Sequence, residues 1–167
     1  MEETTSADRA TSARLEGKYL TFSLAEEEYG IGILKVKEII GMMPITTVPR
    51  MPSHVKGVIN LRGKVIPVID LRLKFAMAEA AYTEHTCIIV VDAAGGAGRL
   101  LIGIIVDSVS EVLNVKAADI EDTPAFGEKL DTKDILGMTK TGGRVRILLD
   151  IDRILSSEAL GMMEKTA

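Results

Sequence analysis

Two aspartates, Asp70 and Asp150, are the residues best placed to do acid–base chemistry in this 167-residue chain. A pair of carboxylates can serve as general acid and general base, so a small-barrel enzyme that uses Asp70 and Asp150 is one reading. Each aspartate, however, follows a β-branched stretch and directly precedes a short segment of helical character, which begins at Leu71 and at Ile151. Aspartate at such a position caps a helix N-terminus. Capping explains both residues at once, and we therefore expect no catalytic residue.

Other reactive side chains are scarce. The chain has one cysteine, two histidines and no tryptophan, and 4% of its residues are aromatic. Cys87 alone cannot form an internal disulfide or a CxxC pair, and His54 and His85 lack the spacing of an HExxH metal site. The run from Gly95 to Gly98 lacks the lysine and hydroxyl residue of a phosphate-binding loop, and 139–144 has the elements of such a loop in the wrong order. No metal and no cofactor is expected.

The charge balance and the hydropathy pattern limit the classes of partner. Lys plus Arg is 20 and Asp plus Glu is 24, so the chain carries −4 and no basic face suited to nucleic acid is expected. The longest apolar run, Leu100 to Val106, is far shorter than the roughly 20 residues of a membrane-spanning helix. Residues 1–17 have no apolar segment of the signal-peptide type and are predicted to form a disordered polar tail. With a single cysteine, the chain is typical of a cytoplasmic protein.

The elements that must position these residues are predicted to be short strands, because the apolar stretches are brief, β-branched and separated by glycines and polar clusters. The clearest hairpin joins 57–61 to 64–69 through Arg62-Gly63. The stretch from Leu34 to Met43 is predicted to be a turn followed by a strand, since it is rich in β-branched residues and ends at Pro44. Further strands are expected at 19–24, 28–33, 86–92, 99–106, 109–115, 135–141 and 144–149, with helices at 71–75 and from Ile151 to about Met162.

The two halves of the chain repeat one another. The matched pairs include Gly30 with Gly103 and Glu38 with Glu111 at an offset of 73 residues, and Gly63 with Gly143, Val65 with Val145 and Asp70 with Asp150 at an offset of 80. The difference between the offsets places an insertion in the second copy, within Lys116 to Lys133. We therefore predict an all-β protein with short helices, built from two pseudo-symmetric five-stranded barrels at about 18–84 and 85–156. A C-terminal helix follows, with its end and a tail in 157–167.

Four blocks of sequence resemble one known family. These are GVINLRGKVIPVIDLRLKF at 57–75, EEYGIGILKVKEII at 27–40, GIIVDSVSEVL at 103–113 and ILLDIDRIL at 147–155. In their order and spacing they closely resemble the CheW family of bacterial chemotaxis coupling proteins, from about Lys18 to Leu155. The resemblance implies a CheW-like domain at 18–156 in which two SH3-like barrels are intertwined.

The resemblance also implies a role. Members of this family are non-catalytic adaptors that couple chemoreceptor tips to the histidine kinase CheA and help to build the receptor array. The implied partners are chemoreceptor cytoplasmic tips, the regulatory domain of CheA and other copies of this chain in array rings, with no nucleic acid and no direct membrane insertion. The implied location is cytoplasmic, at the inner face of the membrane through receptor arrays. The alternative is a coupling protein of a chemosensory pathway that does not serve motility.

A receptor tip is a helical hairpin, and the docking of a helix requires an apolar groove with polar residues at its edges. Three aliphatic residues of the first copy match Val106, Val109 and Val112 of the second, so a seam between the copies would bring the two sets together. We predict a receptor-binding groove formed by Ile33, Val36, Glu38, Ile39, Arg62, Val106 and Val109. The alternative is that at least half of the aliphatic residues belong to the core.

Arg62 is a charged residue that the duplicated scaffold does not require, because its counterpart is Gly142. The resemblance implies an ion pair between Arg62 and Glu38 beside the receptor and kinase surfaces, and an exposed pair contributes less than about 1 kcal/mol. Phe126 lies in the inserted stretch, where an aromatic residue favours a contact anchor, although it could instead cap the second core. The resemblance implies kinase contacts at Ile45, Val65, Arg62 and Phe126.

Overall fold

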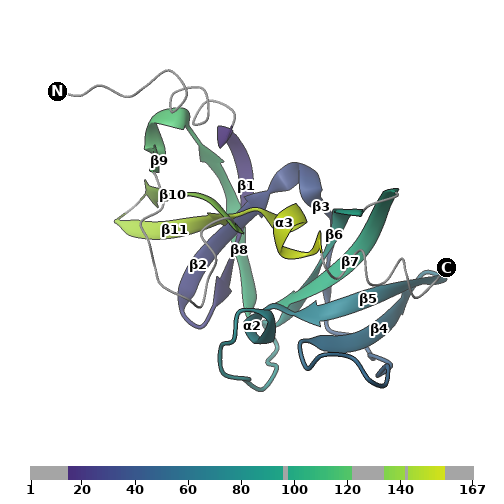
Figure 1. The fold of residues 1–167 in the computed structure, drawn as a ribbon. Helices are drawn as coiled ribbons and strands as arrows, with labels where there is room; N and C mark the ends of the chain where they lie inside the picture. The colour runs from purple at the N-terminus through teal and green to yellow at the C-terminus, as the bar shows by residue number, and fades with distance from the viewer. Residues whose placement is uncertain (1–14, 96–97, 122–133, 142, 157–167) are drawn as a thin grey trace.

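The computed structural model describes residues 15–95, 98–121, 134–141 and 143–156. Within these ranges the chain forms two β-sheets that lie side by side, with a few very short helices (Figure 1). No helix among the described residues is long and apolar enough to cross a membrane. The strands are β1 Gly17–Leu24, β2 Glu27–Gly32, β3 Val36–Gly41, β4 Val55–Leu61, β5 Lys64–Asp70, β6 Cys87–Gly95, β7 Gly98–Val106, β8 Ser108–Val115, β9 Ile120–Glu121, β10 Ile135–Thr141 and β11 Arg144–Leu149. The helices are η1 Ile33–Lys35, α2 Leu71–Lys74, η2 Ala117–Asp119 and α3 Ile151–Ile154.

The two sheets exchange strands between the halves of the chain. Sheet A has the order β8-β1-β2-β11-β10-β9, and sheet B has the order β3-β6-β7-β5-β4. The parallel pairs β2·β11 and β5·β7 each join the two halves. The position near residues 84 and 85 therefore does not divide the chain between the sheets, in agreement with the intertwining that the resemblance implies. The physical reason is that parallel neighbours need a long connection between them, which the intervening strands supply.

The duplication predicted from the offsets is visible in the strand pairing. The two sheets have the same strand order when each strand of sheet A is replaced by the strand that matches it in the other half of the chain. Strand β9 is an additional short strand of sheet A. The parallel registers agree, since Leu148 lies opposite Gly30 and Val68 lies opposite Gly103. A register shift precedes Gly57 in one hairpin and Gly137 in the other. Strand β9 and η2 lie inside the predicted insertion, of which 122–133 is outside the described residues.

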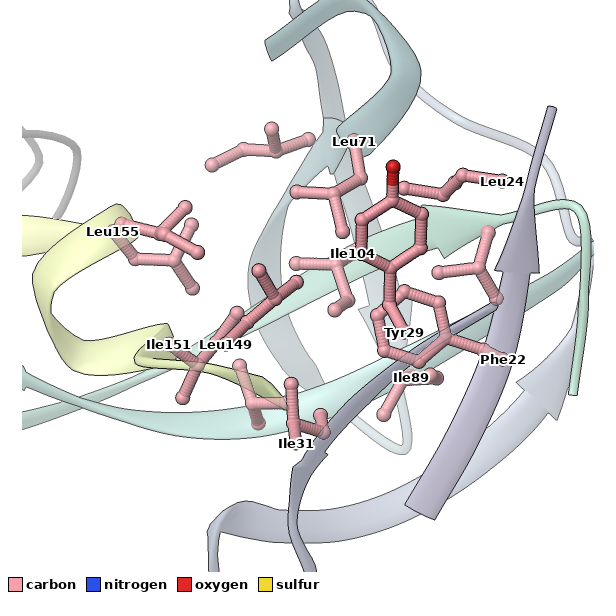
Figure 2. Packing of buried hydrophobic residues seen from close by; sticks show 14 of the residues in the cluster. Phe22, Leu24, Tyr29, Ile31, Leu71, Ile89, Ile104, Leu149, Ile151 and Leu155 are labelled. Atoms are coloured by element: carbon pink, nitrogen blue, oxygen red, sulfur yellow. The ribbon is translucent and has the colours of Figure 1, made fainter. Parts of the chain in front are cut away.

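The largest hydrophobic cluster lies between the sheets. It joins Phe22 and Ile31 of sheet A to Ile89 and Ile104 of sheet B, and Leu155 at the end of α3 packs against it (Figure 2). A second cluster belongs to sheet B alone and contains Ile59, Ile66, Val68, Ile88, Val90 and Ile105. The corresponding cluster of sheet A is smaller, with Tyr19, Val115 and Leu148 fully buried. The seam between the two copies is thus mainly core.

The two aspartates have the capping roles predicted for them. The Asp70 carboxylate accepts hydrogen bonds from the backbone N–H groups of Arg72 and Leu73 at 3.0 and 3.4 Å, and Asp150 accepts one from Arg153 at 3.2 Å. These bonds satisfy N–H groups that have no partner inside a helix. Helix α3 is described only as far as Ser156, so the rest of the helix predicted to reach Met162 lies outside the described residues.

Asp107 joins three segments at the point where the chain passes from β7 to β8. Its carboxylate accepts hydrogen bonds from Arg72 Nε and Nη2 at 2.8 and 2.7 Å and from the backbone N–H of Ala25 at 2.8 Å. Burial by itself raises the Asp107 pKa, but the hydrogen bonds from Arg72 and Ala25, together with the Arg72 charge, outweigh it and lower the pKa. The carboxylate therefore ties α2 and the β1–β2 turn to the crossover between the sheets.

We expect Asp107→Asn to lower the free energy of unfolding by about 1 kcal/mol at neutral pH, a modest value because the side chain is one-third exposed. A group with a lowered folded-state pKa contributes stability that is present above its unfolded pKa of about 3.9 and is lost as the pH falls through the folded pKa. The difference between wild type and variant should therefore shrink below about pH 4. Urea unfolding at a series of pH values measures it, with the exposed Glu84→Gln as control. A difference that persists at the lowest pH contradicts the assignment.

Candidate functional site

The β4–β5 hairpin carries the ion pair predicted from the sequence. Arg62 and Gly63 have φ values of +52° and +89°, which is the backbone of a type I′ turn. Arg62 Nη1 donates to Glu38 Oε2 at 3.0 Å, and Nη2 donates to Glu38 Oε1, so the contact is bidentate. These hydrogen bonds are the main reason that the Glu38 pKa lies below its ordinary value, with the Arg62 charge adding to the effect. The pair links the hairpin to the edge strand β3.

A hollow of about 370 Å³ and a pocket of about 270 Å³ lie beside this ion pair on sheet B. The buried side chains of Ile66 and Val90 form the apolar lining of the pocket together with partly buried Leu101. The rim is charged. The complete lining of this hairpin pocket is Lys37, Glu38, Leu61, Arg62, Lys64, Ile66, Val90 and Leu101. The arrangement offers shape and charge to a partner, with no reactive group inside it.

The predicted groove residues divide between core and surface. Val106 is 1% exposed, because β7 lies in the interior between the sheets, and the expectation that it lines an open groove is corrected. Ile33, Val36 and Val109 are partly buried against the same central cluster. Ile39 is exposed by 43% in β3 and does not line the hairpin pocket. The alternative reading, in which about half of the seam is core, describes these residues better.

The residues predicted to contact the kinase lie in different environments. Val65 is 70% exposed and is the second residue of β5 after the Arg62-Gly63 turn. Ile45 is partly buried against the core of sheet B. Phe126 lies outside the described residues. The structure thus places Val65 and the Arg62 ion pair on one hairpin.

Sequence reasoning missed Leu34, which is 92% exposed in η1. Its neighbour Lys35 forms an ion pair with Asp152 of α3, which holds η1 against that helix. A single exposed leucine in a turn does not change the hydrophobic periodicity of a sequence, so its exposure could be identified only from the fold. Leu34 lies just before β3, and Ile39 lies within that strand.

The alternative of an enzyme that uses Asp70 as an acid or base is not favoured, because the Asp70 carboxylate is already hydrogen-bonded within the fold. In addition to its two backbone partners it accepts a hydrogen bond from the Tyr82 hydroxyl at 2.8 Å. Burial, together with this bond and the charges of Asp70 and Glu79, raises the pKa of Tyr82. Among the described residues no group of His, Cys, Asp and Glu side chains is arranged to hold a metal ion.

These features define a docking module. It consists of two strand-exchanged barrels in which the two aspartates cap helices, and it carries an exposed ion pair and an apolar pocket. Its distinctive features are surfaces that a partner can contact. Comparison with known proteins agrees with this class. The CheW-like domain family matches residues 18–159, so the chain belongs to the CheW family, and its two sheets are the SH3-like barrels expected from the resemblance.

Relatives and a solved structure cover nearly the whole chain. The chemotaxis protein CheW of Klebsiella aerogenes is 42% identical over 166 residues, which is 96% of this chain and 98% of that protein. The chemotaxis protein CheW of Rhizobium meliloti is 33% identical over 83% of this chain and 87% of its own length. The crystal structure of the scaffolding protein TtCheW from Thermoanaerobacter tengcongensis matches with a TM-score of 0.73 and 35% identity, over 84% of this chain and 93% of that one. The family is one of chemotaxis scaffolds and is not a known enzyme family.

Proposed function

We propose that this chain is the adaptor that couples chemoreceptor cytoplasmic tips to the regulatory domain of the histidine kinase CheA, and that it takes part in building the receptor array. The observation that carries the proposal is the bidentate contact between Arg62 and Glu38 on the hairpin that also exposes Val65. Membership of the CheW family supports the same role. The chain would then act in the cytoplasm, at the inner face of the membrane through its receptors.

The backbone of Arg62 supports a functional reason for this residue. A non-glycine residue at φ +52° costs free energy relative to glycine, and the matching turn of the second copy has Gly142 at this position. An exposed ion pair adds less than about 1 kcal/mol of stability. The arginine therefore contributes little to folding, and its guanidinium serves to orient Glu38 and the exposed hairpin for partners. Ile39, Leu34 and Val65 supply neighbouring aliphatic contact surface.

We expect Glu38→Ala and Arg62→Ala each to reduce receptor-dependent stimulation of CheA autophosphorylation by about ten-fold, because the loss of the pair misplaces a contact at the centre of the surface. The measurement reconstitutes the chain with CheA and a receptor cytoplasmic fragment, and co-sedimentation reports binding. Thermal melting should change little in either variant, since both side chains are at the surface.

The control is Arg62→Gly, which removes the guanidinium while giving the turn its preferred residue. It should melt at or slightly above the wild-type temperature and still lose stimulation. If Glu38→Ala and Arg62→Ala both retain wild-type kinase activation and receptor clustering, the role given to this ion pair is wrong. A role in a chemosensory pathway other than motility would retain the same contacts, and it is distinguished by which receptors the chain co-sediments with.

A further inference from the structure

The interiors of the two barrels have opposite chemistry at matched positions. In sheet B the residues Ile59, Ile66, Val90 and Leu101 are aliphatic, and they contribute to a single apolar cluster. The offsets and strand registers match them to four polar residues of sheet A, which are Thr139, Arg146, Thr21 and Glu28. The duplication has therefore kept the backbone and reversed the polarity of these positions.

Two of these four polar residues, Glu28 and Arg146, form a buried ion pair, and Thr21 binds the backbone of Glu111, whereas the Thr139 hydroxyl has no hydrogen-bond partner among the described residues. Arg146 Nε donates to Glu28 Oε1 at 2.7 Å, and the two side chains are only 10% and 11% exposed. Arg146 Nη2 lies 3.6 Å from Glu111 Oε2, and the Thr21 hydroxyl donates to the Glu111 carbonyl at 2.8 Å. Arg144 lies 3.4 Å from Glu28 at the surface. These side chains fill the place that corresponds to the hairpin pocket of sheet B.

The two sheets differ in polarity because each places its arginine at a different position. Glu38 and Glu111 are matched residues of β3 and β8, and each faces an arginine. The arginine of sheet B is Arg62 at the exposed turn, which leaves the interior apolar and open. The arginine of sheet A is Arg146, which lies in the interior and is buried. Among the described residues, sheet B therefore presents a pocket where sheet A presents a buried ion pair.

The charges around the hairpin pocket indicate what it can hold. Arg62 is paired with Glu38, and Lys37 lies 3.7 Å from Asp92. Lys64 is exposed at the rim and forms no ion pair with another described residue. The hollow of about 370 Å³ shares Lys37, Lys64 and Leu101 with the pocket, so the depression continues along the sheet. An aliphatic side chain fits the apolar lining, and a carboxylate beside it complements Lys64.

We propose that the hairpin pocket docks a peptide segment of a protein partner in which a leucine-type side chain stands next to a carboxylate, and that Glu28 and Arg146 deny sheet A an equivalent site. The inference rests on the proposed adaptor function for its biological partner. Within the described residues it assigns this docking pocket to sheet B alone in spite of the internal duplication, with Glu28 and Arg146 as specificity-determining residues.

The test is a methyl NMR titration of the full chain with two blocked dipeptides, N-acetyl-leucyl-glutamate amide and N-acetyl-leucyl-lysine amide. The glutamate probe should shift the methyl signals of Leu61, Ile66, Val90 and Leu101 and leave Leu113 and Leu148 of sheet A unchanged. It should bind about five-fold more tightly than the lysine probe. In Lys64→Glu, an exposed substitution, the order of the two probes should reverse. Absence of shifts at the pocket, or equal shifts on both sheets, overturns the proposal.

Glu28→Leu combined with Arg146→Ile gives sheet A the residues of sheet B. In this double variant the glutamate probe should also shift Leu113 and Leu148, because Arg144 is the counterpart of Lys64 and loses its carboxylate neighbour. A folded double variant with no second set of shifts contradicts the role of the ion pair. If the double variant does not fold, the wild-type and Lys64→Glu titrations still decide the pocket itself.

The titration and the kinase assay separate this inference from the proposed function. Wild-type protein that binds the glutamate probe at the pocket but does not stimulate CheA contradicts the adaptor role alone. Wild-type protein that stimulates CheA but shows no pocket shifts contradicts the docking inference alone.

Discussion

Replacing Gly57 with alanine is expected to lower the free energy of unfolding by about 3 kcal/mol. The residue has φ +141°, and an added Cβ would lie 2.0 Å from the Thr46 carbonyl oxygen and 2.7 Å from its carbon. That carbonyl is fixed, because Thr46 and Val58 exchange two backbone hydrogen bonds of 2.8 and 2.9 Å. The alanine variant must break these bonds or move the strand. Urea denaturation followed by circular dichroism measures the loss.

Gly41→Ala is the matched control for Gly57→Ala. Gly41 also lies in a strand of sheet B, and a Cβ there meets nothing within 4 Å. We expect a change within about 0.5 kcal/mol, since surface changes away from strained sites are small. Equal stability of the two variants would show that the approach of Thr46 to Gly57 does not constrain this hairpin.

Arg146→Ile should lower the free energy of unfolding by about 3 kcal/mol, because it removes the buried partner of the Glu28 carboxylate and leaves the surface residue Arg144 as its remaining arginine partner among the described residues. Glu28→Leu should be similarly costly, since it removes the carboxylate that accepts the 2.7 Å hydrogen bond from the buried Arg146 side chain. The double variant is expected to recover to within about 1 kcal/mol of wild type, because a buried ion pair exchanged for packed aliphatic residues is close to neutral.

A double-mutant cycle in urea measures the coupling between these two residues. Arg144→Ile is the control, because that side chain is largely exposed and should cost less than about 0.5 kcal/mol. Additive effects of Glu28→Leu and Arg146→Ile would contradict a coupled pair and would weaken the explanation given for the closed interior of sheet A.

The local structure of this protein follows closely from its sequence. The hairpin at Arg62-Gly63, the turn and strand after Leu34, and both aspartate caps are present as predicted. Each depends on residues near in the sequence, whose turn and capping chemistry is specific. The duplication was also detectable, because its glycines and charged residues match at fixed offsets.

The exchange of strands could not be predicted from the same pattern. Strand β2 could complete a sheet with β5 or with its repeat β11, and both candidates present similar β-branched residues. The opposite charges of Glu28 and Arg146 favour the pairing of β2 with β11, because these two residues lie directly opposite one another in the parallel pair. A charged pair buried at a repeat position that is otherwise aliphatic is the signal that sequence reasoning could have used.

The candidate site was predicted in part. The comparison of repeat positions singles out Arg62, the family resemblance implies its pairing with Glu38, and the structure confirms the bond between the side chains. The division of the seam into buried Val106 and exposed Ile39 depends on how the two sheets pack, which is a long-range property. The apolar pocket depends on where one arginine lies in each copy, and that became visible only when the two sheets were aligned.

The exchange of strands also has a consequence for synthesis on the ribosome. Sheet B is complete once β7 has emerged, whereas β1 and β2 must wait for β8 and β11, which end at Val115 and Leu149. At about 5–20 residues per second, the hairpin that ends at Gly32 spends on the order of ten seconds without its final neighbours. During that time the apolar side chains of Tyr29 and Ile31 lack the part of their cluster that Leu149 and α3 supply. Translation therefore leaves the first hairpin of this chain without its last strand neighbour until β11 has emerged.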